Sequence, residues 1–96
     1  MNKGIIKIKS TKPPIVELDS TAHAAYVRFS RKKVAKTELL NSGKIFVTMD
    51  LAADGSVIGI ELVGVDEFSI DTLLDQSKVQ APKSLTRKTR YVPACA

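Results

Sequence analysis

The side chains best suited to chemistry in this sequence are three carboxylates, an arginine and a tyrosine, which lie in or beside short apolar segments. Side chains alternate between the two faces of a strand, so the spacing predicts one polar face. Its candidate cluster is Tyr26, Arg28, Glu38, Asp50 and Glu61. Grouped carboxylates could act as an acid–base pair or bind a hard cation. A flat sheet face offers no cleft to shift their pKa values, so we expect charges paired across strands rather than a catalytic site.

Other chemical motifs are missing from the sequence. His23 and Cys95 are the only histidine and cysteine, which leaves no intrachain disulfide and too few ligands for a zinc site. Cys95 stands one residue from the end, and we expect an inert surface thiol there. The five glycines form no phosphate-binding loop. We therefore expect no enzyme activity, no catalytic residue, no metal and no cofactor.

The segments that must position the polar cluster have the composition of β-strands. Asp54-Gly55 is a hairpin signal because both residues tolerate the backbone angles of tight turns, and Asn41-Ser-Gly43 is a second turn. A polar stretch at 30–33 is expected to form another. Short turns join antiparallel neighbours, so the simplest topology is a meander. The five expected strands are residues 15–19, 24–29, 34–40, 44–51 and 57–63.

The strand pattern stops near residue 65 and a helical pattern follows. Ser69 is a good N-cap, Asp71 adds negative charge to the first turn, and apolar side chains recur at helical spacing. We expect a helix over about residues 69–78. The predicted fold class is α+β: a single antiparallel β-meander of four to five strands with one C-terminal helix packed on its apolar face. The predicted parts are a basic leader at 1–14 that could add an edge strand, a domain at 15–79, and a basic flexible tail at 80–96.

The expected sheet has an apolar face that one helix cannot cover. Five strands span roughly 19 Å, whereas a helix is about 10 Å wide. Either a second copy of the chain covers the remainder or the tail folds over it. We expect a homodimer, the commonest closed assembly. The expected apolar face comprises Val16, Leu18, Ala25, Val27, Phe29, Ile45, Val47, Met49, Leu51, Ile58, Ile60 and Leu62.

Charge is distributed unevenly along the chain. The net charge is +5, with +4 in residues 1–14, +4 in residues 79–96 and −3 between them. Basic ends could bind nucleic acid, or they could be solubilising tails. The candidate nucleic-acid contacts are Lys83, Arg87, Lys88 and Arg90. No apolar run approaches the ~18 residues of a membrane span, and the start lacks the apolar segment of a signal peptide. We expect a cytoplasmic protein with no membrane contact.

Three blocks of the sequence resemble the family called domain of unknown function 2283. They are Leu18 to Ser30, which includes Ala-Tyr-Val-Arg-Phe, then Val34-Ala-Lys-Thr-Glu38, and Val47 to Glu61 with its Asp-Gly and Gly-Ile-Glu. The resemblance covers about residues 15–65 and implies a small single-sheet protein, mostly bacterial, with no established activity. Leu18 stands where the family pattern has tyrosine, and His23 where it has aspartate. The missing acid at His23 weakens any proposal of a cation site in that loop.

These observations favour a non-enzymatic interaction module. It would self-associate or bind a protein partner, for example as an antitoxin-like component of a larger complex. Nucleic-acid binding through the basic ends is the alternative, and an enzyme or metal site on the polar face is a further one. The sequence names no partner, ligand or pathway.

Overall fold

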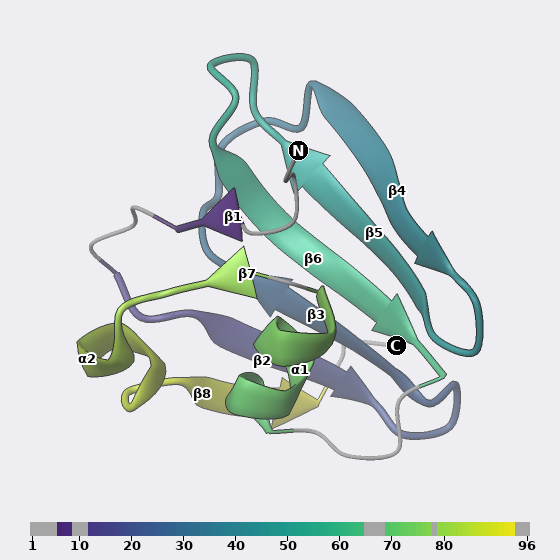
Figure 1. The fold of residues 1–96 in the computed structure, drawn as a ribbon. Helices are drawn as coiled ribbons and strands as arrows, with labels where there is room; N and C mark the ends of the chain where they lie inside the picture. The colour runs from purple at the N-terminus through teal and green to yellow at the C-terminus, as the bar shows by residue number, and fades with distance from the viewer. Residues whose placement is uncertain (1–5, 9–11, 65–68, 78, 94–96) are drawn as a thin grey trace.

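Six strands form one mixed sheet in the computed structural model, which describes residues 6–8, 12–64, 69–77 and 79–93 (Figure 1). The strands are β2 (Ile15–Asp19), β3 (Ala24–Arg28), β4 (Lys36–Ser42), β5 (Phe46–Leu51), β6 (Val57–Val63) and β8 (Arg90–Pro93). Their order across the sheet is β4-β5-β6-β3-β2-β8. Two short strands, β1 (Ile6–Lys7) and β7 (Val79–Gln80), pair separately in parallel. The helices are α1 (Ile70–Ser77) and α2 (Lys83–Thr86).

The predicted antiparallel meander with one helix is wrong. β3 pairs with β6 rather than with β4, and β8 adds a parallel strand beside β2. Residues 30–33 therefore do not form a hairpin turn: they begin a connection from the middle of the sheet to its edge. The backbone amides of Phe29 and Ser30 both donate to the carbonyl of Ile58, at 2.8 and 3.1 Å, so contact with β6 continues beyond the end of β3.

Burial explains why β6 is central and β4 lies at the edge. Ile58, Ile60 and Leu62 of β6 are at most 1% exposed, whereas most of β4 is exposed. A strand with many apolar side chains gains most between two neighbours, while a polar strand tolerates an open edge. The chain therefore places its most apolar strand in the interior, although β4 comes earlier in the sequence.

The described part of the basic segment predicted at 80–96, residues 80–93, belongs to the fold. Its described residues form the end of β7, α2 and β8, and β8 pairs with β2 from Ile15↔Arg90 to Leu18↔Pro93. The amide of Arg90 donates to the carbonyl of Pro14 at 3.2 Å, and Thr86 is buried. At the other end of the chain, β1 lies in the small parallel pair rather than at an edge of the main sheet. Cys95 and the end of the predicted tail lie outside the described residues.

The predicted apolar face is the core, and one chain covers most of it. α1 and the β1–β7 pair lie across this face of the sheet (Figure 1). Ser69 caps α1 as expected, because its Oγ accepts from the amide of Thr72 at 3.2 Å. Ile70, Leu73 and Leu74 from α1 join the core. Of the predicted face, Val16, Ala25, Val27, Phe29, Val47, Met49, Ile58, Ile60 and Leu62 are buried, and Leu18, Ile45 and Leu51 are partly buried.

This cover removes the reason given by the sequence for a homodimer. The expectation assumed a broad apolar face with a single short helix over it. In the structure, Ile8 and Val79 also join the core beside α1, and the side chains of the core are already buried within one copy. Among the described residues, no helix is long and apolar enough to cross a membrane.

Candidate functional site

The polar face of the sheet contains a hydrogen-bond network centred on Asp50. The Tyr26 hydroxyl donates to Oδ2 of Asp50 at 2.8 Å, and the Thr37 hydroxyl donates to Oδ1 at 2.6 Å. Both carboxylate oxygens thus receive a charge-assisted bond. Asp50 lies on β5, Thr37 opposite it on β4, and Tyr26 on β3, with β6 between. The hydrogen bond between Tyr26 and Asp50 therefore crosses over β6, which separates β3 from β5.

Gly59 allows Tyr26 to reach across β6. Gly59 lies opposite both Asp50 and Arg28 in the register of the sheet. A Cβ built on Gly59 would stand 2.3 Å from Cζ and from Oη of Tyr26, a distance that atoms cannot adopt. The aromatic ring therefore occupies the space that any other residue at position 59 would fill. A glycine inside a strand is typical of such close approach.

Arg28 and Glu17 extend the network to β2. The Arg28 guanidinium lies 4.9 Å from the centroid of the Tyr26 ring, within cation–π range. Its Nε and Nη2 donate to the two carboxylate oxygens of Glu17, each at 3.4 Å. Both side chains of this ion pair are about one-third exposed. From Thr37 to Glu17, the polar contacts extend from β4 to β2 across the sheet.

The environment of Tyr26 keeps its phenol protonated. Partial burial raises the pKa of Tyr26 well above its usual value of 10.0, and the hydrogen bond to the Asp50 carboxylate raises it further. A phenol that stays protonated near neutral pH cannot act as a general base, and the hydroxyl hydrogen of this one is held in the hydrogen bond to Asp50. The observed chemistry of these groups is mutual hydrogen bonding.

The structure brings together three of the five residues predicted for this cluster: Tyr26, Arg28 and Asp50. Glu61 lies opposite Tyr26 on β6 and is exposed. Glu38 lies on the other face, because it is opposite the buried Met49. Its carboxylate pairs with Lys36 at 2.9 Å. The predicted placement of Glu38 on the polar face was therefore wrong, because a difference of one residue in register moves a side chain to the other face.

Sequence reasoning missed Thr37, Glu17 and Gly59 as members of the network. Thr37 follows from the register of β4 against β5, which shifts between Leu39 and Asn41 and which the expected turn did not predict. Glu17 lies between the predicted apolar residues Val16 and Leu18, so alternation places it on the polar face, but the sequence does not indicate its ion pair with Arg28. Gly59 did carry a signal, since a glycine within an apolar strand indicates a close approach by another group.

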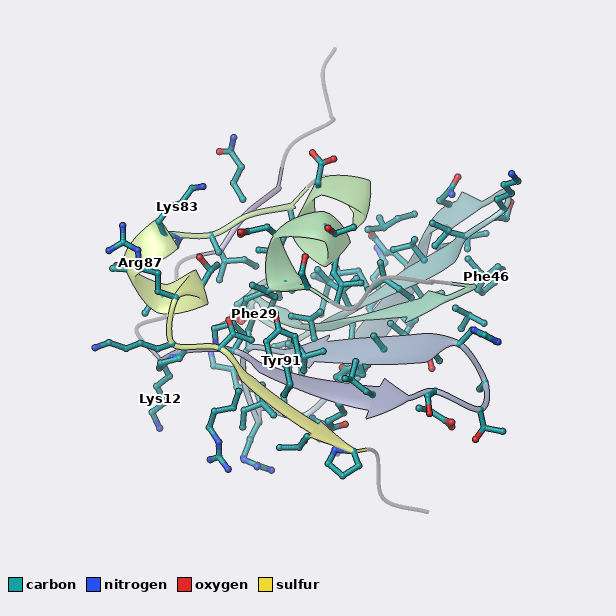
Figure 2. The ribbon with its side chains drawn as sticks, turned by 90° about the horizontal axis from the view of Figure 1, so that it is seen from below. Lys12, Phe29, Phe46, Lys83, Arg87 and Tyr91 are labelled. Atoms are coloured by element: carbon teal, nitrogen blue, oxygen red, sulfur yellow. The ribbon has the colours of Figure 1, made fainter. Side chains whose placement is uncertain are left out.

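The four basic candidates for nucleic-acid contact lie together at the α2 end of the molecule. Lys83 begins α2, Arg87 and Lys88 follow it, and Arg90 begins β8. All four are exposed. Figure 2 shows Lys83 and Arg87 projecting from α2. Residues 82–93 contain these four bases and no acid, so this end presents concentrated positive charge.

Next to this end is a shallow pocket between α1, β7 and α2. Its volume is about 660 Å³. Leu74 and Val79 supply an apolar floor, while Asp71, Asp75 and Lys83 contribute charged groups. Opposite charges line the same opening, so the pocket does not select one sign of ligand. Within the described residues, no group of three or more His, Cys, Asp or Glu side chains could hold a metal ion.

The opposite edge of the sheet has a different character. β4 pairs only with β5 among the described strands, so its outer side is open (Figure 1). Leu39 is 56% exposed on β4, and Phe46 is 45% exposed on β5. Leu39 lies opposite Thr48, two residues from Phe46, so the two apolar side chains are diagonal neighbours on the polar face. Figure 2 shows Phe46 at the end of the molecule far from α2.

Together these features define a small mixed β-sheet domain with a polar network on one face and an open strand at one edge. Residues 15–65 match the family described as Protein of unknown function (DUF2283), and the chain belongs to this family. The match covers β2 to β6 and ends before α1. No curated protein and no solved structure matches the chain.

Proposed function

We propose that this protein is a non-enzymatic interaction module that adds an extended protein strand to the open edge of β4. The proposal depends on one observation: β4 is a seven-residue strand at the edge of the sheet, with the exposed Leu39 on it and the exposed Phe46 beside it. An edge strand presents backbone N–H and C=O groups that another strand can bind, and nearby apolar side chains add specificity. The added strand comes from a second copy or from another protein.

The other edge of the sheet is less suited to this role. β8 is a four-residue strand that ends in Pro93, which cannot donate a backbone hydrogen bond. Prolines and short lengths are common protections of edge strands. The asymmetry between the two edges supports β4 as the binding edge.

The test compares two variants that gain the same charge. Leu39→Lys adds a lysine to the β4 edge, and Ser84→Lys adds one to the exposed surface of α2. Each tagged variant is purified from cells that also make a second, differently tagged wild-type copy. We expect Ser84→Lys to retain the same bound proteins as the wild type and Leu39→Lys to lose them. Equal retention by both variants, or no bound protein with the wild type, would contradict the proposal.

A second candidate function is nucleic-acid binding by the basic α2 end. The supporting observation is that Lys83, Arg87, Lys88 and Arg90 are exposed on one short segment with no acid. Such residues neutralise phosphates and release counterions, which makes binding sensitive to salt. Replacing all four with glutamine should abolish salt-sensitive retention on DNA or RNA. Deleting the segment is an unsuitable test, because it also removes β8 from the sheet.

A further inference from the structure

We infer that the strand bound by β4 is β4 of a second copy, antiparallel to the first and centred on Thr37. This inference rests on the proposed function and specifies its partner and register. The inference depends on two oppositely charged side chains on the open edge, Lys36 and Glu38. They form an ion pair within one copy, with Nζ of Lys36 2.9 Å from Oε2 of Glu38, and are 66% and 40% exposed. They are two residues apart in one strand and therefore on the same face.

Two-fold symmetry limits the registers that β4 can adopt with itself. Residues directly opposite each other in an antiparallel pair must have side chains on the same face of the sheet. The two-fold axis between the copies must therefore pass beside one residue of each strand, because an axis between two residues would oppose side chains that point to different faces. Centring on Thr37 puts each Lys36 opposite the partner copy's Glu38. Centring one residue earlier opposes lysine with lysine, and one residue later opposes glutamate with glutamate. Like charges directly opposite each other are destabilising.

The shape of β4 selects the same register. The pairing with β5 shifts between Leu39 and Asn41, so the second half of β4 is irregular. Bulges of this kind commonly stop a strand from pairing at its open side. The regular part extends toward the N-terminus, because the amide of Ala35 still donates to Leu51 at 2.8 Å. A pair centred on Thr37 uses residues 34–40, which contain this regular part.

This register also covers apolar side chains that are exposed in one copy. Leu39, 56% exposed, would lie opposite Ala35, and Val34, 45% exposed, would lie opposite Leu40, which is partly buried against the core. The two Thr37 residues would face each other on the polar face, and threonine pairs are favourable across strands. The contact is small, so we expect a reversible dimer whose formation depends on concentration.

Charge reversal tests the register. In the Thr37-centred register, each Lys36 faces the Glu38 of the other copy, so this contact occurs twice. Lys36→Glu makes both contacts glutamate against glutamate, and Glu38→Lys makes both lysine against lysine. Each single variant should weaken self-association about tenfold, as measured by analytical ultracentrifugation. An equimolar mixture of the two single variants should form a heterodimer, because the glutamates of one copy then face the lysines of the other at both positions. The double variant, Lys36→Glu with Glu38→Lys, should associate like the wild type.

Lys88→Glu makes the same charge change far from β4 and should not alter association. If the single variants associate like the wild type, or if mixing them restores nothing, the register is wrong. If the wild type is monomeric at every concentration while Leu39→Lys still loses a different bound protein, the second copy is wrong and the proposed function stands. If Leu39→Lys also changes nothing, both fail.

Discussion

The ring of Tyr26 lies directly over Gly59, in the space that a side chain at that position would occupy. The contact matters beyond local packing because Gly59 separates Asp50 from Arg28 in the sheet. An empty position on β6 lets the tyrosine reach from β3 to the Asp50 carboxylate on β5. The glycine, tyrosine and aspartate therefore form one unit that links three strands of the sheet.

Gly59→Ala should destabilise the protein by about 1–3 kcal/mol, the usual cost of inserting a methyl group into filled space. The added Cβ displaces the ring and breaks the bond between Tyr26 and Asp50. Gly43→Ala is the matched control, because its Cβ would meet no atom closer than 3.8 Å. Urea unfolding measures both variants. A cost for Gly59→Ala that persists in the Tyr26→Ala background would show that the ring is not the obstacle.

Tyr26→Phe should lower the free energy of unfolding by about 1–2 kcal/mol at neutral pH, because a hydrogen bond to a charged group is lost. It should also change how the free energy of unfolding depends on pH in alkaline solution. The pKa of Tyr26 is raised in the folded state, so its contribution is complete below about pH 10 and declines as the pH rises toward the folded value.

Chemical unfolding at about pH 9 and about pH 11 measures this difference. The wild type should lose more stability than Tyr26→Phe over that interval, because only the wild type has this phenol to ionise on unfolding. Equal losses in the two proteins would contradict the assigned environment of Tyr26.

The stabilising contribution of Asp54 should depend on pH in the opposite direction, because it is lost in acid. Its carboxylate accepts bonds from the hydroxyl of Ser56 at 2.6 Å, from the amide of Ser56 at 2.9 Å and from Lys32 at 2.9 Å. These bonds, chiefly from the Ser56 hydroxyl, hold the pKa of Asp54 well below its usual value of 3.8. The contribution is present above about pH 4 and is lost as the pH falls further.

Asp54→Asn should therefore unfold with a weaker dependence on pH below about pH 4 than the wild type. Asp75→Asn removes the same charge from the exposed side of α1 and serves as the control. Thermal unfolding at several acid pH values compares the three proteins. If Asp54→Asn and the wild type lose stability in parallel, the turn carboxylate is not the group that titrates.

Alternation and turn chemistry were sufficient to predict the apolar face of the sheet. The buried positions Val47, Ile58 and Ile60 all lie on the predicted apolar face. The Asp-Gly turn joins β5 and β6, and Gly55 adopts a φ of +87°, in the region that favours glycine. Each of these features depends on residues close in sequence, so local physical rules determine them.

The order of the strands depends on competition between distant segments, which local rules do not contain. β3 could pair with β4 or with β6, and the greater apolar content of β6 decides the outcome. The register of β4 against β5 was also missed: it shifts between Leu39 and Asn41, and it places Glu38 opposite Met49 and Thr37 opposite Asp50. The C-terminal segment was misread because its bases and prolines are typical of tails, while the partner that orders it, β2, lies about 75 residues earlier.

Removing residues 90–96 should destabilise the protein by about 2 kcal/mol or more, because the backbone hydrogen bonds between β2 and β8 are lost. Tyr91 adds to this cost, since its hydroxyl accepts a bond from the amide of Ile70 at the start of α1. The control replaces Lys83, Arg87, Lys88 and Arg90 with glutamine, which removes the charge and keeps the strand. The free energy of unfolding of this variant, measured in urea, should stay within about 0.5 kcal/mol of that of the wild type. A truncated protein as stable as the full chain would mean that β8 is not part of the folded sheet.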